Sequence, residues 1–133
     1  TLDDLFSLVT LELVEPKIDS NKIVFLNDYP PYAAALAKID KRGWAQRFEV
    51  YWQDLELGNA FYELNDPVIQ EQRFVEDNLK KKQNKLDALP MDQSFLNCLQ
   101  QGLPPTAGIS IGLERLYMAL FDEAEINRIK WFV

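Results

Sequence analysis

Residues 47–64 read RFEVYWQDLELGNAFYEL, and this stretch decides the fold. Aromatic and β-branched residues dominate it, which is typical of β-strands. The polar pair Gln53-Asp54 interrupts the apolar pattern and predicts a two-residue turn. The sequence therefore predicts an antiparallel hairpin in which Tyr51 faces Glu56.

The alternation of side chains decides which residues of this hairpin share a face. Successive side chains of a strand point to opposite faces, so Arg47, Glu49 and Tyr51 share one face. Glu56 joins them from across the turn. Like charges this close repel each other unless a cation relieves them. Glu49 and Glu56 are therefore candidate ligands of Mg²⁺, which binds to one or two carboxylates together with substrate phosphates.

Gly58 is the second informative position of the hairpin. On a regular strand Asn59, Phe61 and Glu63 would point away from Glu49, but a glycine inside a strand often marks a β-bulge. One extra residue there would turn these side chains onto the acidic face. An amide, an aromatic ring and a carboxylate suit a ligand with an ammonium group on an alkyl chain. A solvated acidic sheet face is the alternative that the spacing leaves open.

Periodicity and turn signals predict the other elements. Helices are expected over four ranges and after Gly112: residues 3–14, 33–39, 66–86 and 92–101. Short strands are expected at residues 23–26 and 108–111. Asp66-Pro67 is a helix-start signature, because Asp caps a helix and Pro suits its first position. Periodicity alone therefore supports a mixed α and β protein.

The last helix contains an apolar stripe and one misplaced charge. Four residues at helical spacing are expected to be buried: Leu113, Leu116, Tyr117 and Leu120. Arg115 lies off this stripe in the first turn, where the helix dipole disfavours a cation. The position suggests that Arg115 faces an anion. A surface arginine paired with Glu114 or Glu123 is the alternative.

Composition excludes several classes of function. The chain has 133 residues, enough for one domain with a core, and a net charge of −7. That charge argues against a general nucleic-acid surface, which needs clustered Lys and Arg. The basic run at residues 80–82 is expected to be the solvated face of a helix. The absence of histidine excludes Ser-His-Asp and Cys-His catalysis and His-ligated metals.

Cysteine content and hydropathy indicate the cellular compartment in which the protein is expected. One cysteine excludes an internal disulfide and fits a reducing compartment. No apolar run approaches the ~20 residues that a membrane-spanning helix needs. We therefore expect a cytoplasmic protein without a membrane partner.

Two motifs together resemble the class II lysyl-tRNA synthetase family. RFEVYWQDLELGNAFYELNDPVIQEQRF, residues 47–74, is similar to the strand pair and following helix of that family. GLPPTAGISIGLERLYM, residues 102–118, resembles its third class-defining motif. The resemblance implies an α+β fold with an antiparallel β-sheet flanked by helices. Residues 1–133 would be the C-terminal part of a class II aminoacyl-tRNA synthetase-like catalytic core.

Within this family the chain is more similar to the truncated paralogues that attach β-lysine to a lysine of elongation factor P. AAALA at residues 33–37 and the helix before Pro16 both resemble the paralogues. Ser110 stands where the synthetases have a glycine, and a side chain there would reshape the amino-acid pocket. An ordinary lysyl-tRNA synthetase that charges tRNA(Lys) is the alternative. A non-catalytic domain that keeps the fold and binds a partner or lysine is a third.

The resemblance assigns roles by matching position. Two acidic residues would hold Mg²⁺ and ATP: Glu49 and Glu56. Four residues would line the pocket for lysine or β-lysine, with Glu63 pairing the side-chain ammonium: Asn59, Phe61, Glu63 and Ser110. Two residues would meet the nucleotide: Gly112, whose backbone passes close to it, and Arg115, the catalytic residue at the γ-phosphate.

The implied reaction joins lysine to ATP as an acyl-adenylate, releases pyrophosphate and then transfers the acyl group to an amine or hydroxyl. The family's first two motifs, which build the dimer interface and grip the α-phosphate, are absent from the sequence. We therefore expect a homodimer for a full-length protein and little adenylation by this chain alone. Ala60 stands where the family has a glycine, so the local backbone could differ from that of the family.

Overall fold

The computed structural model describes residues 2–130, which belong to two compact units. Residues 1–62 and 107–133 form the first unit, and residues 63–106 form the second. The expectation that residues 1–133 are part of one catalytic domain stays a prediction. The two units are described separately below.

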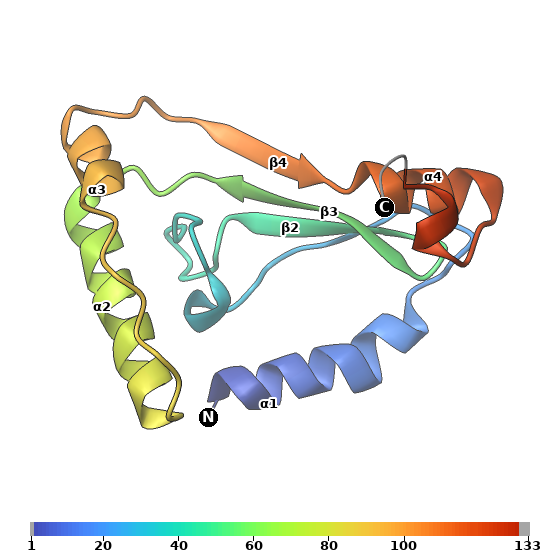
Figure 1. The fold of residues 1–133 in the computed structure, drawn as a ribbon, viewed down its shortest axis with the longest axis horizontal. Helices are drawn as coiled ribbons and strands as arrows, with labels where there is room; N and C mark the ends of the chain where they lie inside the picture. Colours follow the sequence, from blue (N-terminus) through green and yellow to red (C-terminus); the bar gives the residue numbers. More distant parts are fainter. Residues whose placement is uncertain (1, 131–133) are drawn as a thin grey trace. The chain divides into compact units, whose positions relative to one another are not determined.

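The first unit contains a four-stranded antiparallel sheet with the strand order β1-β2-β3-β4 (Figure 1). Its strands are β1 (Val24–Leu26), β2 (Arg47–Trp52), β3 (Leu55–Tyr62) and β4 (Ala107–Ile111). The predicted hairpin and both predicted short strands are confirmed. Together with the helices described below, the sheet confirms the expected α+β class.

The turn between β2 and β3 lies at the predicted pair. Gln53 and Asp54 have φ values of 50° and 61°, so both central residues adopt the left-handed conformation of a mirror-image hairpin turn. Such turns match the right-handed twist of the two strands. The Gln53 N–H donates to the carbonyl of Ser20 at 3.2 Å, which ties the turn to the segment before β1.

The N-terminal helix follows the prediction with an irregular second half. α1 (Leu2–Val9) continues as a π-helical turn (Thr10–Val14) and a 3-10 turn (Glu15–Lys17). Phe6 of α1 packs edge-on against Tyr29 and Tyr32, with ring centroids 6.0 and 5.8 Å apart. Tyr29 is 4% exposed, so this contact fixes α1 to the core of the first unit.

The predicted helix at residues 33–39 is wrong. A 3-10 turn (Pro31–Ala33) ends there, and Ala35 has a φ of 49°, which an α-helix does not contain. Lys38 instead pairs by its backbone with both Tyr62 and Gln46, at 2.8 Å each. Alanine-rich composition favours a helix, but backbone pairing with the open end of the β2–β3 hairpin determines the conformation here.

The last helix forms as expected but buries a different face. α4 (Leu113–Phe121) contacts β3 and buries Met118 and Ala119. Three of the four stripe residues are exposed, namely Leu113, Tyr117 and Leu120, and Leu116 is half-buried. A helical repeat predicts that apolar residues share a side, but it does not say which edge of that side meets the sheet.

The second unit contains the two remaining helices, α2 (Pro67–Gln83) and α3 (Gln93–Gln100). Asp66 caps α2 by accepting from the N–H groups of Val68 and Ile69, at 2.9 and 3.1 Å. Asp92 caps α3 by accepting from the N–H group of Phe95 at 2.9 Å. Both predicted helices are confirmed, and α2 ends three residues before the expected 86. None of the helices described for this chain has the length and hydropathy to cross a membrane.

Candidate functional site

A β-bulge beside Gly58 organises the site. Val50 pairs with Gly58, but Tyr51 pairs with Glu56, so Leu57 is an extra residue in β3. Beyond the bulge Glu49 lies opposite Asn59 and Arg47 lies opposite Phe61. The predicted register shift is therefore confirmed, and it places Asn59 and Phe61 on the face that carries the two glutamates.

Gly58 is required by the close approach of β4. A Cβ atom at this position would lie 2.9 Å from the backbone oxygen of Ser110. A neighbouring backbone atom cannot move away as a flexible side chain could. The neighbouring Ala60, by contrast, is buried at 4% exposure and pairs regularly with Phe48 and Ile109, so the strand accommodates its methyl group.

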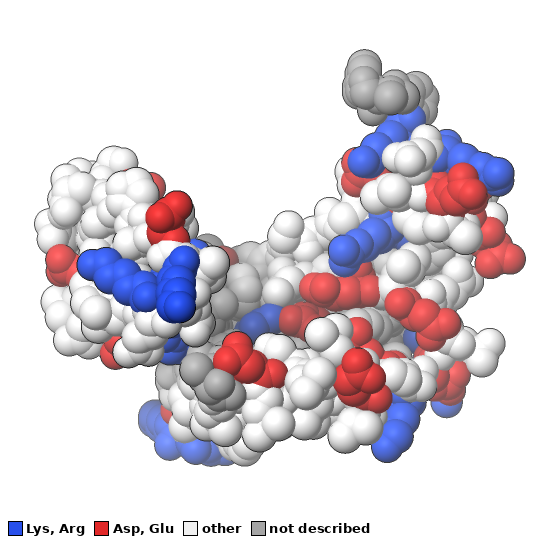
Figure 2. All heavy atoms as spheres, turned by 60° about the horizontal axis from the view of Figure 1, so that its bottom comes forward, with Lys and Arg blue, Asp and Glu red and all other residues white. Residues whose placement is uncertain are grey.

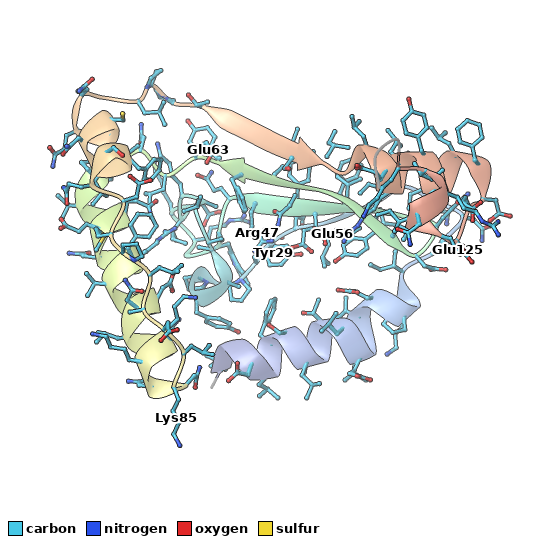
Figure 3. The ribbon with its side chains drawn as sticks, in the orientation of Figure 1. Tyr29, Arg47, Glu56, Glu63, Lys85 and Glu125 are labelled. Atoms are coloured by element: carbon cyan, nitrogen blue, oxygen red, sulfur yellow. The ribbon has the colours of Figure 1, made fainter. Side chains whose placement is uncertain are left out.

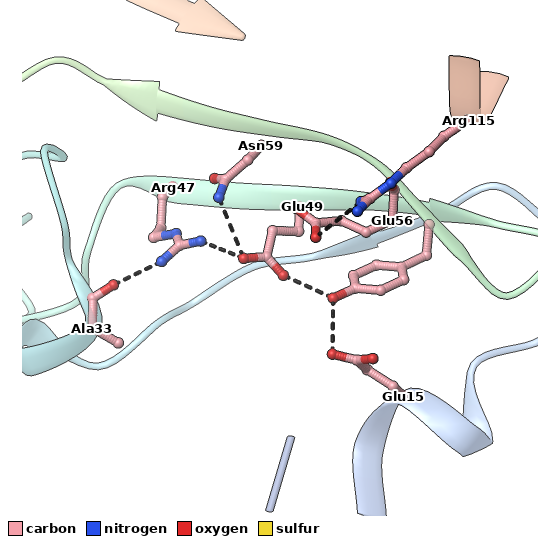
Figure 4. Close-up of polar contacts among 8 residues, drawn as sticks. Glu15, Ala33, Arg47, Glu49, Glu56, Asn59 and Arg115 are labelled. Atoms are coloured by element: carbon pink, nitrogen blue, oxygen red, sulfur yellow. Dashed lines mark hydrogen bonds and ion pairs between the residues drawn. The ribbon is translucent and has the colours of Figure 1, made fainter. Parts of the chain in front are cut away.

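Glu49 is the centre of the polar network on this face (Figure 4). Its carboxylate accepts hydrogen bonds from the Arg47 guanidinium, from the Tyr51 hydroxyl at 2.8 Å and from Asn59 Nδ2 at 3.5 Å. The Tyr51 hydroxyl also lies 3.2 Å from a carboxylate oxygen of Glu15. Three donors thus hold one carboxylate, which gives Glu49 a fixed orientation.

Arg115 faces an anionic group, as its position predicted. Its Nη1 donates to the backbone oxygen of Glu56 at 2.9 Å and lies 3.6 Å from a carboxylate oxygen of the same residue. Glu123, one partner of the alternative, is instead paired with Arg128 at 3.4 Å. The Arg115 side chain is 51% exposed. It therefore contacts both Glu56 on the sheet and the solvent.

The two carboxylates influence each other. Burial raises the pKa of Glu56, the negative charge of Glu49 raises it further, and Arg115 and Arg47 only partly oppose this. A divalent cation between the two carboxylates would relieve that repulsion, so the donor set fits a hard cation such as Mg²⁺. Among the described residues no group of three or more His, Cys, Asp or Glu could hold a metal. A cation here would therefore take its further ligands from water or from a substrate.

Arg47 lies between two aromatic rings. Its guanidinium carbon is 4.1 Å from the centroid of the Tyr29 ring and 5.3 Å from that of Phe61. Tyr29, Arg47 and Glu56 lie on the side of β2 and β3 that faces α1 (Figure 3). Burial and the Glu49 charge raise the pKa of Tyr29. Alternation along β2 placed Arg47 and Tyr51 on this face, but no local pattern pointed to Tyr29 or Glu15.

The remaining predicted site residues lie in different parts of the structure. Ser110 of β4 pairs with Asn59, so Glu49, Asn59 and Ser110 form a row across three strands. Asn59 Oδ1 is buried without a hydrogen-bond partner. Gly112 precedes α4, and the stem of Arg115 lies 3.6 Å from the place of a Cβ there. Glu63 belongs to the second unit, where its N–H donates to Thr106 at 2.9 Å.

Charge on the surface is mixed. On the face shown in Figure 2, acidic side chains lie among separate groups of basic ones rather than beside one continuous basic area. Residues 80–82 form the last turn of α2. The argument from the net charge of −7 against a general nucleic-acid surface stays a prediction.

Comparison with known proteins adds an independent line of evidence. A family model described as tRNA synthetases class II (D, K and N) matches residues 9–133. The elongation factor P–(R)-β-lysine ligase of Hamiltonella defensa is 37% identical over 132 residues, and that of Vibrio cholerae is 39% identical over 132 residues. Each alignment covers 98% of this chain and 41% of the relative.

A lysine–tRNA ligase is similar to the same degree. The enzyme of Chloroflexus aurantiacus is 39% identical over 133 residues, which are 98% of this chain and 26% of the relative. The chain thus spans about two fifths of the length of the β-lysine ligases that it matches. The antiparallel sheet, the bulged hairpin and the family match agree, and the chain belongs to the class II tRNA synthetase family as part of its α+β core.

Proposed function

We propose that this chain carries part of the site of a ligase that activates lysine or β-lysine with ATP and transfers it to a lysine of elongation factor P. The observation that carries the proposal is the bulge at Leu57-Gly58. It brings an amide and an aromatic ring onto the face of two glutamates beside an arginine. The names of two relatives, both elongation factor P–(R)-β-lysine ligases, support the choice of substrates.

Glu49 and Glu56 would hold Mg²⁺ and, through it, ATP. When bound, Mg²⁺ would neutralise charge on the phosphate oxygens. Arg115 would move from the Glu56 carboxylate to the γ-phosphate, because its half-exposed side chain can turn toward solvent. Gly112, which has no side chain at the start of α4, would leave space for the nucleotide beside the Arg115 stem.

The proposed amino-acid pocket lies along the row that begins at Glu49. The unpartnered oxygen of Asn59 would accept a hydrogen bond from a substrate amine. Phe61 would pack against the alkyl chain, and Ser110, opposite Asn59 in the register, would shape the end of the pocket. The family motif alone assigns Glu63 to the side-chain ammonium of the substrate.

The chemistry needs charge stabilisation more than acid–base groups. The lysine carboxylate would attack the α-phosphate of ATP, pyrophosphate would leave, and an amine would then displace AMP from the acyl-adenylate. Arg115 would stabilise the negative charge that builds up on the leaving pyrophosphate. Glu49, already oriented by Arg47, would act with Glu56 to keep the nucleotide in line for the attack. We propose that the complete protein acts as a cytoplasmic homodimer.

A lysine–tRNA ligase is the second candidate, because the Chloroflexus relative is as similar as the β-lysine ligases. The complete protein should be incubated with ATP and labelled lysine or β-lysine, with either elongation factor P or tRNA(Lys). Labelling of the factor supports the first candidate, and labelling of tRNA supports the second. No binding of MgATP or lysine in calorimetry would indicate a non-catalytic relative.

Arg115→Met tests the role assigned to Arg115 in the activation step. We expect activation, measured as lysine-dependent exchange of pyrophosphate into ATP, to fall by about 100-fold or more, the typical cost of removing one charge-stabilising donor. Arg128→Met is the matched control, because Arg128 is also an exposed arginine paired with a glutamate. Exchange that is equally unaffected in both variants would contradict the role of Arg115.

A further inference from the structure

The side chain of Arg47 has contacts that the proposed ligand roles do not use. Its side chain is 10% exposed, and its Nε is buried without a hydrogen-bond partner. A buried charge is costly unless it is paired. Nη1 donates to the backbone oxygen of Ala33 at 2.9 Å, and Nη2 donates to Glu49. The rings of Tyr29 and Phe61 lie against it at 4.1 and 5.3 Å.

These contacts connect parts of the site that are separate in sequence. Ala33 ends the 3-10 turn before the hairpin, Glu49 lies on β2 and Phe61 on β3. A planar guanidinium can donate in two directions and still offer its flat face to an aromatic ring, which an ammonium group cannot do. The Arg47 side chain therefore holds both Glu49, the candidate metal ligand, and Phe61, the aromatic residue of the proposed lysine pocket.

We propose that Arg47 is a positioning residue, which holds Glu49 and Phe61 in the geometry that binds the metal-nucleotide and the lysine chain. The inference rests on the proposed function and extends it to a residue that contacts neither ligand. The Ala33 carbonyl anchors one nitrogen of the guanidinium, so the other nitrogen presents a fixed donor to Glu49. Tyr51 and Asn59 complete the set of donors around that carboxylate.

The charge distribution supports the same role. Each of the two carboxylates has its own arginine, because Arg47 pairs with Glu49 and Arg115 pairs with Glu56. Arg115 is half-exposed and is assigned to the nucleotide, whereas Arg47 is enclosed. Without Arg47 the repulsion between Glu49 and Glu56 would act on a carboxylate that keeps only neutral donors, so Glu49 would turn away from its present position.

A purely structural role is the competing explanation. Arg47 could fasten the turn at Ala33 to the sheet and have no influence on ligands. Its loss would then lower the melting temperature and leave the affinity of the folded protein unchanged. The two explanations therefore differ in binding measured well below the melting temperature of each variant.

The experiment uses Arg47→Met, Arg47→Lys and the control Arg42→Met in the complete protein. Arg42 is an exposed arginine that pairs with Asp28 and Asp40 rather than with Glu49. Calorimetry would measure the affinity of each variant for MgATP and, in a separate titration, for lysine. We expect Arg47→Met to weaken MgATP binding by about 10- to 100-fold, the usual effect of removing a partner that orients a metal ligand. Lysine binding should weaken less, Arg47→Lys should recover part of the MgATP affinity, and Arg42→Met should change neither.

A crystal structure of Arg47→Met separates this inference from the proposed function. Displacement of Glu49 from Tyr51 and Asn59 supports the positioning role even if the wild-type protein binds neither ligand, a result that would reject the proposed function alone. A Glu49 carboxylate that keeps both hydrogen bonds in the variant overturns the inference. Wild-type affinity for MgATP in the folded Arg47→Met variant overturns it as well.

Discussion

At the scale of single residues, a substitution of Gly58 has a clear expected effect, because the atom closest to the new side chain is the backbone oxygen of Ser110. Gly58→Ala would place a methyl group 2.9 Å from the Ser110 oxygen, and β3 and β4 would have to separate. Urea denaturation should show a loss of about 1–3 kcal/mol in the free energy of unfolding. Gly112→Ser is the control, since the nearest atoms to its Cβ would be those of the flexible Arg115 side chain, at 3.6 Å. Equal stability of Gly58→Ala and wild type would mean that β4 does not approach Gly58 this closely.

Glu56 gives a prediction about pH. Burial and Glu49 raise its pKa in the folded protein, so the folded state holds the proton more tightly than the unfolded state does. This contribution to stability is present at low pH and is lost as pH rises through the raised pKa. Ionised Glu56 therefore destabilises the fold at neutral pH, and Glu56→Gln should be more stable than wild type there.

The measurement for Glu56 is urea denaturation at several pH values between 4 and 8. The advantage of Glu56→Gln should shrink toward the acid end of the range, where wild-type Glu56 becomes protonated. Glu71→Gln, a change at an exposed position of α2, is the control and should show no such trend. An advantage that is independent of pH would exclude charge repulsion as its cause.

At the scale of elements, the hairpin shows why some local patterns predict structure well. Alternation in β2, the polar pair Gln53-Asp54 and Gly58 are all short-range signals, and together they predicted the turn and the register shift. The segment at residues 33–39 shows the opposite case. Its alanines favour a helix, but the N–H group of Lys38 donates a hydrogen bond to the carbonyl of Tyr62, which is far away in the sequence. A local sequence pattern cannot predict such a long-range hydrogen bond.

The site divides in the same way. Glu49, Glu56, Asn59 and Phe61 come from one hairpin, so their common face could be predicted from side-chain parity and one bulge. Tyr29, Ala33 and Glu15 reach that face from other segments and complete its hydrogen bonds and ring contacts. Their role depends on tertiary packing, and the sequence around each of them carries no comparable signal.

The hairpin turn itself can be tested as an element. Gln53 has a φ of 50°, a conformation that asparagine adopts more readily than glutamine. Gln53→Asn should therefore stabilise the protein by about 0.5–1 kcal/mol in urea denaturation. Gln53→Val should destabilise it, because a β-branched side chain opposes the left-handed conformation. The reverse order of the two variants would contradict the mirror-image turn.

At the scale of the whole molecule, the face of the sheet opposite the site determines how the isolated chain should behave. The strand register places Phe25, Gly58 and Ile111 on that face, and Ile109 joins them. Phe25 is 59% exposed and the two isoleucines are each 49% exposed. β4 is also an edge strand of the sheet. An apolar face beside an open edge is a typical surface for self-association.

The 133-residue chain alone should therefore self-associate as its concentration rises, measured by light scattering after size-exclusion chromatography. Ile109→Thr with Ile111→Thr should reduce this association, because threonine keeps the β-propensity of β4 while it removes apolar surface. Leu79→Gln, a change at an exposed leucine of α2, controls for a general gain in solubility and should have little effect. If the isoleucine variant associates as strongly as wild type while Leu79→Gln does not, the contact lies on the second unit, and the sheet face then has no part in assembly.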